Sequence, residues 1–288
     1  MTEQQQKWVL ACIDGSKHTT AVCDYAAWIS KGIDKPVKLL HNLEHRENLA
    51  TADLSGSIGL GSQEHLLEEL TELEAQRSKL ELKKGKLMLE AAKERVEQAG
   101  ITEPKVSQRH GSLVESLIDL EDAIQVLVLG IRGEAHSHDD SHLGAHLESA
   151  VRALHRPILV VNAEFSVPER IMLAYDGSDA ANKALDTLVS TPIFKGMPCH
   201  LVFAGGHEQP AKGKLSEAER QLSAAGFEVT VATVDGKCDE ALFNYSQKYN
   251  IDLTIMGAYS HTRFRELLLG SFTTKMLLKM NKPVLLLR

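Results

Sequence analysis

The chain has 288 residues, of which 43% are hydrophobic and 25% are charged. These proportions are typical of a globular protein with full-sized cores, and the length favours about two domains. The formal net charge of −7 argues against broad nucleic-acid binding, which needs a basic surface. No apolar run approaches the roughly 20 residues of a membrane-spanning helix, and the first residues contain no secretory signal. We therefore expect a cytoplasmic protein without a membrane span.

The four cysteines give no sign of a disulfide framework. Cys12, Cys23, Cys199 and Cys238 show no CxxC spacing. Cys12 and Cys23 fall in the first predicted strand and in the helix after it, where a free cysteine packs as a small apolar residue. The sequence therefore predicts four reduced thiols.

An internal repeat runs through the chain. Residues 8–16 read WVLACIDGS and residues 170–178 read RIMLAYDGS, so in both copies an apolar run ends at Asp-Gly-Ser. The repeat has a far longer period than a solenoid unit and indicates a duplicated domain. Further matched pairs are VLVLG at 126–130 with LTIMG at 253–257, and HRPILVV at 155–161 with NKPVLLL at 281–287.

Both halves alternate short β-branched runs with helical periodicity, which is typical of an α/β fold with a parallel sheet and crossover helices. The sequence thus predicts two tandem open-sheet domains. Helices are expected after each Asp-Gly-Ser, at 20–29 and 180–189, and Gly100 and Gly226 are expected to end helices as C-cap glycines. In the second half the predicted strands are 170–175, 199–204, 228–233, 253–256 and 284–287, and the other helices are 214–225, 239–249 and 271–279.

The first half contains an insertion. Asp14 and Asp176 lie 162 residues apart, whereas Gly100 and Gly226 lie 126 apart, so the first half carries 36 extra residues, at about 46–85. The segment begins as a Gly/Ser-rich loop and continues with leucines at helical spacing. We expect an amphipathic helix that packs on its own domain or on the neighbouring one; a lid or a partner-docking helix is the alternative. The leucines are Leu66, Leu70, Leu73, Leu80 and Leu87.

We place the domain boundary after an apolar strand, so that the domains span residues 1–163 and 164–288. Each domain ends in a short apolar strand that follows a proline, at 158–161 and 284–287. Such a strand is an aggregation hazard when its edge is exposed. We expect the two terminal strands to pair antiparallel within one chain about a pseudo-two-fold axis, which favours a monomer.

One segment of the second half has the features of a phosphate site. Residues 256–277 read MGAYSHTRFRELLLGSFTTKML, in which a strand ends at Gly257 and a helix begins at Gly270-Ser271. Gly257 would let the backbone turn sharply and a ligand approach closely. The free amides at a helix N-terminus attract phosphate, and Ser271 and Thr273 add hydroxyl donors. Because ligands bind beyond the carboxyl ends of the strands where strand order reverses, Asp176 is expected opposite Gly257.

The tandem of AYDGS with this segment resembles the universal stress protein family, whose ATP-binding members carry G-x2-G-x9-G-[S/T]. The resemblance covers nearly the whole chain, in two copies. The chain is therefore similar to the tandem, E-type members of the family. It implies a five-stranded parallel sheet in each domain, and it implies ATP binding, with Mg²⁺ carried by the nucleotide, where the motif survives. In the second half Ser260 replaces the second glycine while the spacing is kept. The implied nucleotide-binding residues are Asp176, Ala204, Gly257, Ser260, Gly270, Ser271, Phe272 and Thr273.

The first half departs further from the family pattern. Gly130 and Gly133 fit, but ten residues separate Gly133 from Gly144, and Ala145 replaces the hydroxyl residue. We expect a degenerate site there. In this first-half site, Asp14 corresponds to Asp176 and Asn42 corresponds to Ala204.

The loop that replaces the motif in the first half is rich in histidine and aspartate. His136, His138, His142 and His146, with two aspartates between them, suit Zn²⁺ or Ni²⁺, and His142 and His146 would share one face if both are helical. The spacing lacks a fixed metal-binding frame. A solvated loop, a metal site and a pH-sensing cluster therefore all remain open.

No P-loop, G-x-S-x-G or HExxH motif is present. We therefore expect a stress-linked cytoplasmic regulator that binds ATP or a related nucleotide conjugate in its C-terminal domain and acts on an unknown protein partner. One alternative is a slow metal-assisted ATP hydrolase that uses Asp176. The other is an interaction module in which neither site binds nucleotide.

Overall fold

The computed structural model describes residues 6–44, 60–133, 143–205, 213–258 and 271–288, with side chains of the long helix described from residue 69 onward. The first half contains β1 (Trp8–Cys12), α1 (Thr19–Ile33), β2 (Val37–Leu43), α2 (Leu60–Gln98), β3 (Lys105–His110), α3 (Leu113–Leu120), η3 (Glu121–Ala123), β4 (Ile124–Gly130), α4 (Ala145–Ala153) and β5 (Ile158–Val161). The second half contains β6 (Ile171–Ala174), α5 (Asp179–Ser190), η5 (Pro192–Phe194), β7 (Cys199–Ala204), α6 (Lys214–Ala224), β8 (Val229–Val234), α7 (Cys238–Lys248), β9 (Leu253–Gly257), α8 (Ser271–Lys279) and β10 (Val284–Leu287).

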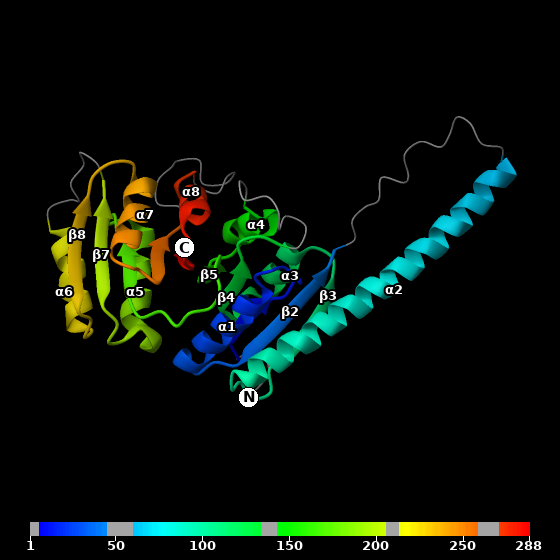
Figure 1. Ribbon diagram of the computed structural model, residues 1–288, viewed down its shortest axis with the longest axis horizontal. Helices are drawn as coiled ribbons and strands as arrows, with labels where there is room; N and C mark the ends of the chain where they lie inside the picture. Colours follow the sequence, from blue (N-terminus) through cyan, green and yellow to red (C-terminus); the bar gives the residue numbers. More distant parts are fainter. Residues whose placement is uncertain (1–5, 45–59, 134–142, 206–212, 259–270) are drawn as a thin grey trace.

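The strands form one continuous ten-stranded sheet in the order β3-β2-β1-β4-β5-β10-β9-β6-β7-β8 (Figure 1). Within each half all neighbouring strands are parallel, and helices lie on both faces. The halves meet where β5 and β10 pair antiparallel, with Leu159 opposite Leu285. Each half is therefore a five-stranded open α/β sheet. The two halves have the same strand order, and the second half runs in the reverse direction along the combined sheet.

The pairing of β5 with β10 follows from their composition. Each is a four-residue apolar strand whose residues are all buried. An apolar strand at an open edge would expose unpaired amide and carbonyl groups as well as apolar side chains. Because each strand covers the other's edge, both sets of groups are satisfied inside the chain.

The predicted α/β fold with two tandem open sheets is confirmed. The ranges of β7, α8 and β10 coincide with the predicted ones, and the other predicted elements of the second half differ by one residue at one or both ends. Gly100 and Gly226 have φ values of +85° and +89°, as expected of glycines that end helices. No helix in the described parts of the chain is both long and apolar enough to cross a bilayer.

Helix α2 is a single helix of 39 residues, and only its C-terminal part packs as expected. Leu89, Ala92 and Val96 are buried, in contact with α1 and β2. Gly85 lies so close to His41 and Gln108 that a side chain at this position would collide with both. Between residues 69 and 81, in contrast, every residue is exposed except the half-buried Leu70, and the helix extends away from the sheet (Figure 1). The expected packing is therefore wrong for this part of the helix.

All four cysteines are free, as predicted. Burial raises the pKa of the Cys23 and Cys199 thiols to about 12. Burial, together with the nearby Asp14 carboxylate, also raises the pKa of Cys12. Cys238 is partly exposed. Since the thiolate is the reactive form, three of the four thiols should be inert in the folded protein.

We predict that a thiol reagent such as DTNB modifies Cys238 alone in the native protein, because the other three cysteines are buried and Cys238 is partly exposed. All four cysteines should react after denaturation. Mass mapping of the modified peptides measures this. Rapid modification of Cys12, Cys23 or Cys199 under native conditions would contradict the described packing.

Candidate functional site

The crevice predicted by the fold lies beyond the carboxyl ends of β6 and β9. These two strands pair in parallel, with Ala174 beside Met256, and the chain leaves them toward opposite sides of the sheet. This is the point where strand order reverses, and it is where open α/β sheets bind ligands. Asp176 lies two residues beyond Ala174, and Gly257 lies one residue beyond Met256, so both lie at this edge of the sheet.

The Asp-Gly-Ser segment forms a tight turn that begins α5. The Ser178 amide donates to Asp176 Oδ1 at 2.9 Å, and Gly177 has φ +74°. The Ser178 hydroxyl then accepts the Ala181 amide at 3.2 Å, which caps the helix. The turn thus accounts for all three residue types, while it holds the Asp176 carboxyl at the crevice.

Gly257 does not make the sharp turn that was predicted for it. It ends β9 without a positive φ. A Cβ here would lie 2.7 Å from both the carbonyl carbon and the Cβ of Ala180. The residue must be glycine because the end of β9 and the first turn of α5 are in direct backbone contact.

Lys214 belongs to the crevice, although the sequence patterns did not identify it as a site residue. Its ammonium donates to the Gly177 carbonyl oxygen at 2.8 Å, and its stem covers Gly177, with Cδ 2.7 Å from where a Cβ would be. The residue that covers the corresponding Gly15 in the first domain is Met88, whose Sδ lies 2.5 Å from the same position. Met88 and Lys214 are 126 residues apart, the same offset as the two C-cap glycines. The repeat offset was therefore the signal that could have found Lys214.

The remaining predicted residues of the second domain differ in their exposure. Ser271 begins α8 and is exposed, whereas Phe272 is half-buried and Thr273 is buried. The Ser271 hydroxyl is therefore exposed, whereas the Thr273 side chain is buried. Ser260 and Gly270 lie outside the described residues.

Ala204 ends β7 next to the start of α7. The Cys238 thiol donates to the Ala204 carbonyl oxygen, with the sulfur 3.1 Å away. Cys238 thus marks the side of the crevice where the resemblance implies adenine. No motif or spacing in the sequence connects this cysteine with the site.

In the first domain the fold also brings together the predicted residues. Asp14 accepts the Ser16 amide at 2.9 Å and the Thr19 hydroxyl at 3.2 Å. A Cβ on Gly133 would lie 3.2 Å from Asp14 Oδ2. Gly144 in turn lies close to Gly133. Gly144 has an extended backbone and directly precedes α4, which begins at Ala145.

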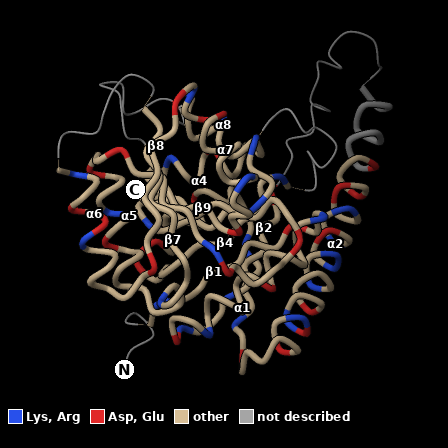
Figure 2. The backbone as a smooth tube through the Cα atoms, turned by 60° about the vertical axis from the view of Figure 1, so that its left-hand side comes forward, with Lys and Arg blue, Asp and Glu red and all other residues tan. Residues whose placement is uncertain are grey.

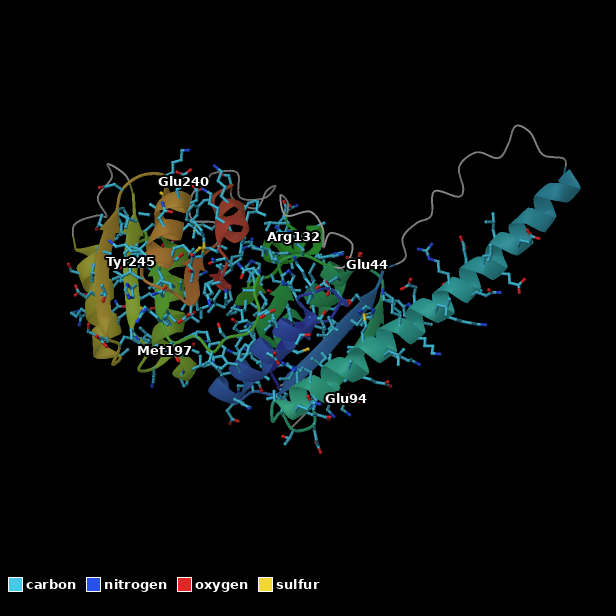
Figure 3. The ribbon with its side chains drawn as sticks, in the orientation of Figure 1. Glu44, Glu94, Arg132, Met197, Glu240 and Tyr245 are labelled. Carbon is cyan, nitrogen blue, oxygen red and sulfur yellow. The ribbon has the colours of Figure 1, made fainter. Side chains whose placement is uncertain are left out.

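Larger side chains occupy the first-domain crevice. His18 is buried against Gly130, where the second domain has Ala180 against Gly257. Arg132 is buried directly after β4 at the same edge (Figure 3). The Asn42 amide donates to the Gly111 and Ser112 carbonyl oxygens and to the Ser116 hydroxyl, so this side chain is committed to the turn before α3. The two crevices therefore share a backbone plan and differ in what fills them.

The histidine-rich loop lies almost wholly outside the described residues, including His136, His138 and His142. His146 is described in α4, with Nε2 3.4 Å from Glu44 Oε2. The described helix α4 begins at Ala145, after the extended Gly144, and contains His146. The described residues contain no cluster of three His, Cys, Asp or Glu side chains suited to a metal ion.

A separate cavity of about 240 Å³ lies between the halves at the amino-terminal ends of β4, β5 and β9. Trp28 from α1 and Phe194 from η5 contribute to its mostly apolar lining. The crevice described above lies at the carboxyl ends of β6 and β9. The cavity is thus distinct from the candidate site.

The sequence profile described as the universal stress protein family matches residues 7–162 and 202–288. The chain belongs to the universal stress protein family. It is 37% identical to universal stress protein Slr1230 of Synechocystis over 98% of this chain and 100% of that protein. It is also 34% identical to universal stress protein MJ0577 of Methanocaldococcus jannaschii over 28% of this chain and 49% of that protein. The crystal structure of a universal stress protein from Archaeoglobus fulgidus matches the fold with a TM-score of 0.70 and 20% identity, covering 99% of both chains.

An ion pair between α7 and α8 holds the helix that carries Ser271. The Lys279 ammonium lies 2.5 Å from Asp239 Oδ2, and Asp239 is buried. The hydrogen bond from Lys279 lowers the pKa of the Asp239 carboxyl. A carboxyl whose pKa is lower in the folded state stabilises the fold above the unfolded pKa of about 4, and this contribution is lost as pH falls through the folded pKa.

We predict that Asp239→Asn lowers the free energy of unfolding by about 1 kcal/mol at neutral pH. The difference from the unmodified protein should shrink below about pH 4, because protonation then removes the same charge. Urea denaturation across a pH series measures it. Glu90→Gln, at an exposed position on α2, is the control and should have little effect. A difference that is constant with pH would show that the ion pair is not the cause.

Proposed function

We propose that this chain is a stress-linked cytoplasmic regulator that binds ATP or a related nucleotide conjugate in its C-terminal domain, and that the N-terminal site is degenerate. The observation that carries the proposal is the pair Lys214 and Met88. At equivalent positions over the two Asp-Gly-Ser turns, the second domain has a cation and the first has a thioether. Only the second crevice thus has a positive charge at this point to meet phosphate.

The phosphates would lie between Lys214 and the first turn of α8. An ammonium has three donors, and one of those of Lys214 is used by the Gly177 carbonyl, which leaves donors for phosphate oxygens. Ser271 adds an exposed hydroxyl at a helix N-terminus, where free amides and the helix dipole favour an anion. The spacing from Gly257 to Gly270-Ser271 agrees with the family's ATP-binding motif.

The base would lie near the end of β7, where Ala204 and Cys238 meet. Asp176 would face the ribose from the other side of the crevice, and Mg²⁺ would arrive with the phosphates. The four features of the first domain that argue against equal binding are His18 against Gly130, Met88 over Gly15, the longer loop and Ala145.

We favour regulation over hydrolysis because the described carboxyl at the crevice has a structural partner. Asp176 Oδ1 accepts the Ser178 amide within the turn that starts α5. A general base needs a free approach to the attacking water. Steady ATP turnover that Asp176→Ala abolishes would instead favour the hydrolase.

We predict that Lys214→Met weakens binding of a non-hydrolysable ATP analogue by at least about tenfold, since it removes a charge-assisted hydrogen bond to phosphate. Isothermal titration calorimetry measures the affinity. The matched control is Met88→Leu, which changes the equivalent residue of the first domain and should leave the affinity unchanged. If the two variants weaken binding equally, the working site has been assigned to the wrong half.

We also predict that ATP slows the alkylation of Cys238, because the base would cover the sulfur where it meets Ala204. The rate of modification by iodoacetamide, followed by mass spectrometry, should fall several-fold at saturating ATP. Inorganic phosphate is the control and should give no protection. An unchanged rate in the presence of bound ATP would place the base elsewhere.

A further inference from the structure

The protruding part of α2 has an unpartnered apolar stripe. Leu73, Leu80 and Leu87 are 61%, 68% and 56% exposed, and they recur every seven residues. Leu70 lies one turn before Leu73 on the same side of the helix. In the seam of a two-helix coiled coil, apolar residues recur at alternate spacings of three and four residues. Here Leu70 fills one of the alternate positions, and Arg77 and Lys84 fill the next two. In the described part of the chain, α2 contacts chiefly α1, β2 and β3, which lie at its C-terminal end.

The charges along the same segment change sign near its middle. Glutamates precede residue 76, and mainly lysine and arginine follow it; Figure 2 shows both signs along the helix. A second copy aligned parallel would place like charges together, whereas an antiparallel copy would place acidic residues against basic ones. The acidic residues are Glu69, Glu72 and Glu74, and the basic residues are Arg77, Lys79, Lys83, Lys84 and Lys86, with Glu81 the exception.

One antiparallel register matches leucine with leucine and most charges with their opposites, and it places Leu70 opposite Lys83. When the midpoint lies between residues 76 and 77, Leu73 of one copy is opposite Leu80 of the other. The same register places Glu74 opposite Lys79 and Glu69 opposite Lys84. Glu72 opposite Glu81 is the one like-charge pair. The segment is thus complementary to itself, which is the requirement for an interface with two-fold symmetry.

We propose that α2 pairs antiparallel with α2 of a second copy of this chain and forms a symmetric dimer. The apolar terminal strands β5 and β10 already cover each other within the chain, so a second copy must bind elsewhere. Gly85, where the helix meets its own domain, lies about 13 Å from the midpoint at 1.5 Å per residue. The two domain bodies therefore lie at opposite ends of the paired helices.

Analytical ultracentrifugation of the full chain over a concentration series tests the proposal. The expected mass at high concentration is twice the 31.7 kDa of one chain. Leu73→Glu combined with Leu80→Glu should weaken association roughly a hundredfold, because the charges would be buried in the seam. Circular dichroism should show an unchanged fold, since both side chains are exposed.

The matched control introduces the same charges on the opposite face, as Ala75→Glu with Ser78→Glu, and should remain dimeric. Both positions are exposed. An unmodified chain that stays monomeric throughout the series would overturn the proposal. So would a dimer that the leucine variant leaves intact.

Disulfide crosslinking tests the antiparallel arrangement, with Cys238→Ser as the background. Leu73→Cys and Leu80→Cys chains should crosslink when mixed, and neither should crosslink efficiently alone, because each residue is displaced from its own copy by about 10 Å along the axis. Efficient crosslinking of each variant with itself would indicate a parallel pair and would overturn the proposed arrangement.

Discussion

The antiparallel pairing of β5 with β10 is the contact on which the rest of this molecule depends. It joins two five-stranded sheets into one and removes the apolar edges that would otherwise be open to other chains. The strands left at the outer edges, β3 and β8, consist mostly of partly or fully exposed residues. A chain whose apolar edges are satisfied internally can associate with a second copy only through another surface, and we propose the leucine stripe in the described part of α2 as that surface.

The duplication also supplies an internal comparison of two sites on one fold. His18 and Ala180, Thr19 and Ala181, and Met88 and Lys214 are equivalent pairs, because they keep the repeat offsets of 162 and 126. Both Asp-Gly-Ser turns have the same backbone geometry, with φ of +75° at Gly15 and +74° at Gly177. The first crevice has larger side chains, Arg132 among them, and has the Met88 thioether in place of the Lys214 ammonium. Such changes leave the sheet intact, since they affect the crevice and not the contacts between strands.

The sequence was enough to predict the fold because periodicity, cap glycines and the repeat all depend on local residue patterns. It also indicated that Asp176 and Gly257 lie at one edge of the sheet, since they follow strand ends that parallel pairing brings to that edge. It did not predict contacts between elements far apart in the chain. The fit of Gly257 against Ala180, the burial of Thr273 and the position of Lys214 all depend on how closely two elements approach. Periodicity also could not show that α2 extends beyond the domain on which it packs. The apolar residues of a coiled-coil seam and those of a core-facing helix recur with nearly the same period.

The central claim is that one of two equivalent crevices binds nucleotide and the other does not. Native mass spectrometry of the full chain with excess ATP analogue counts the bound ligands directly. We predict one nucleotide per chain, and Lys214→Met should remove it. Two nucleotides per chain, or a single one that Lys214→Met leaves in place, would contradict the account.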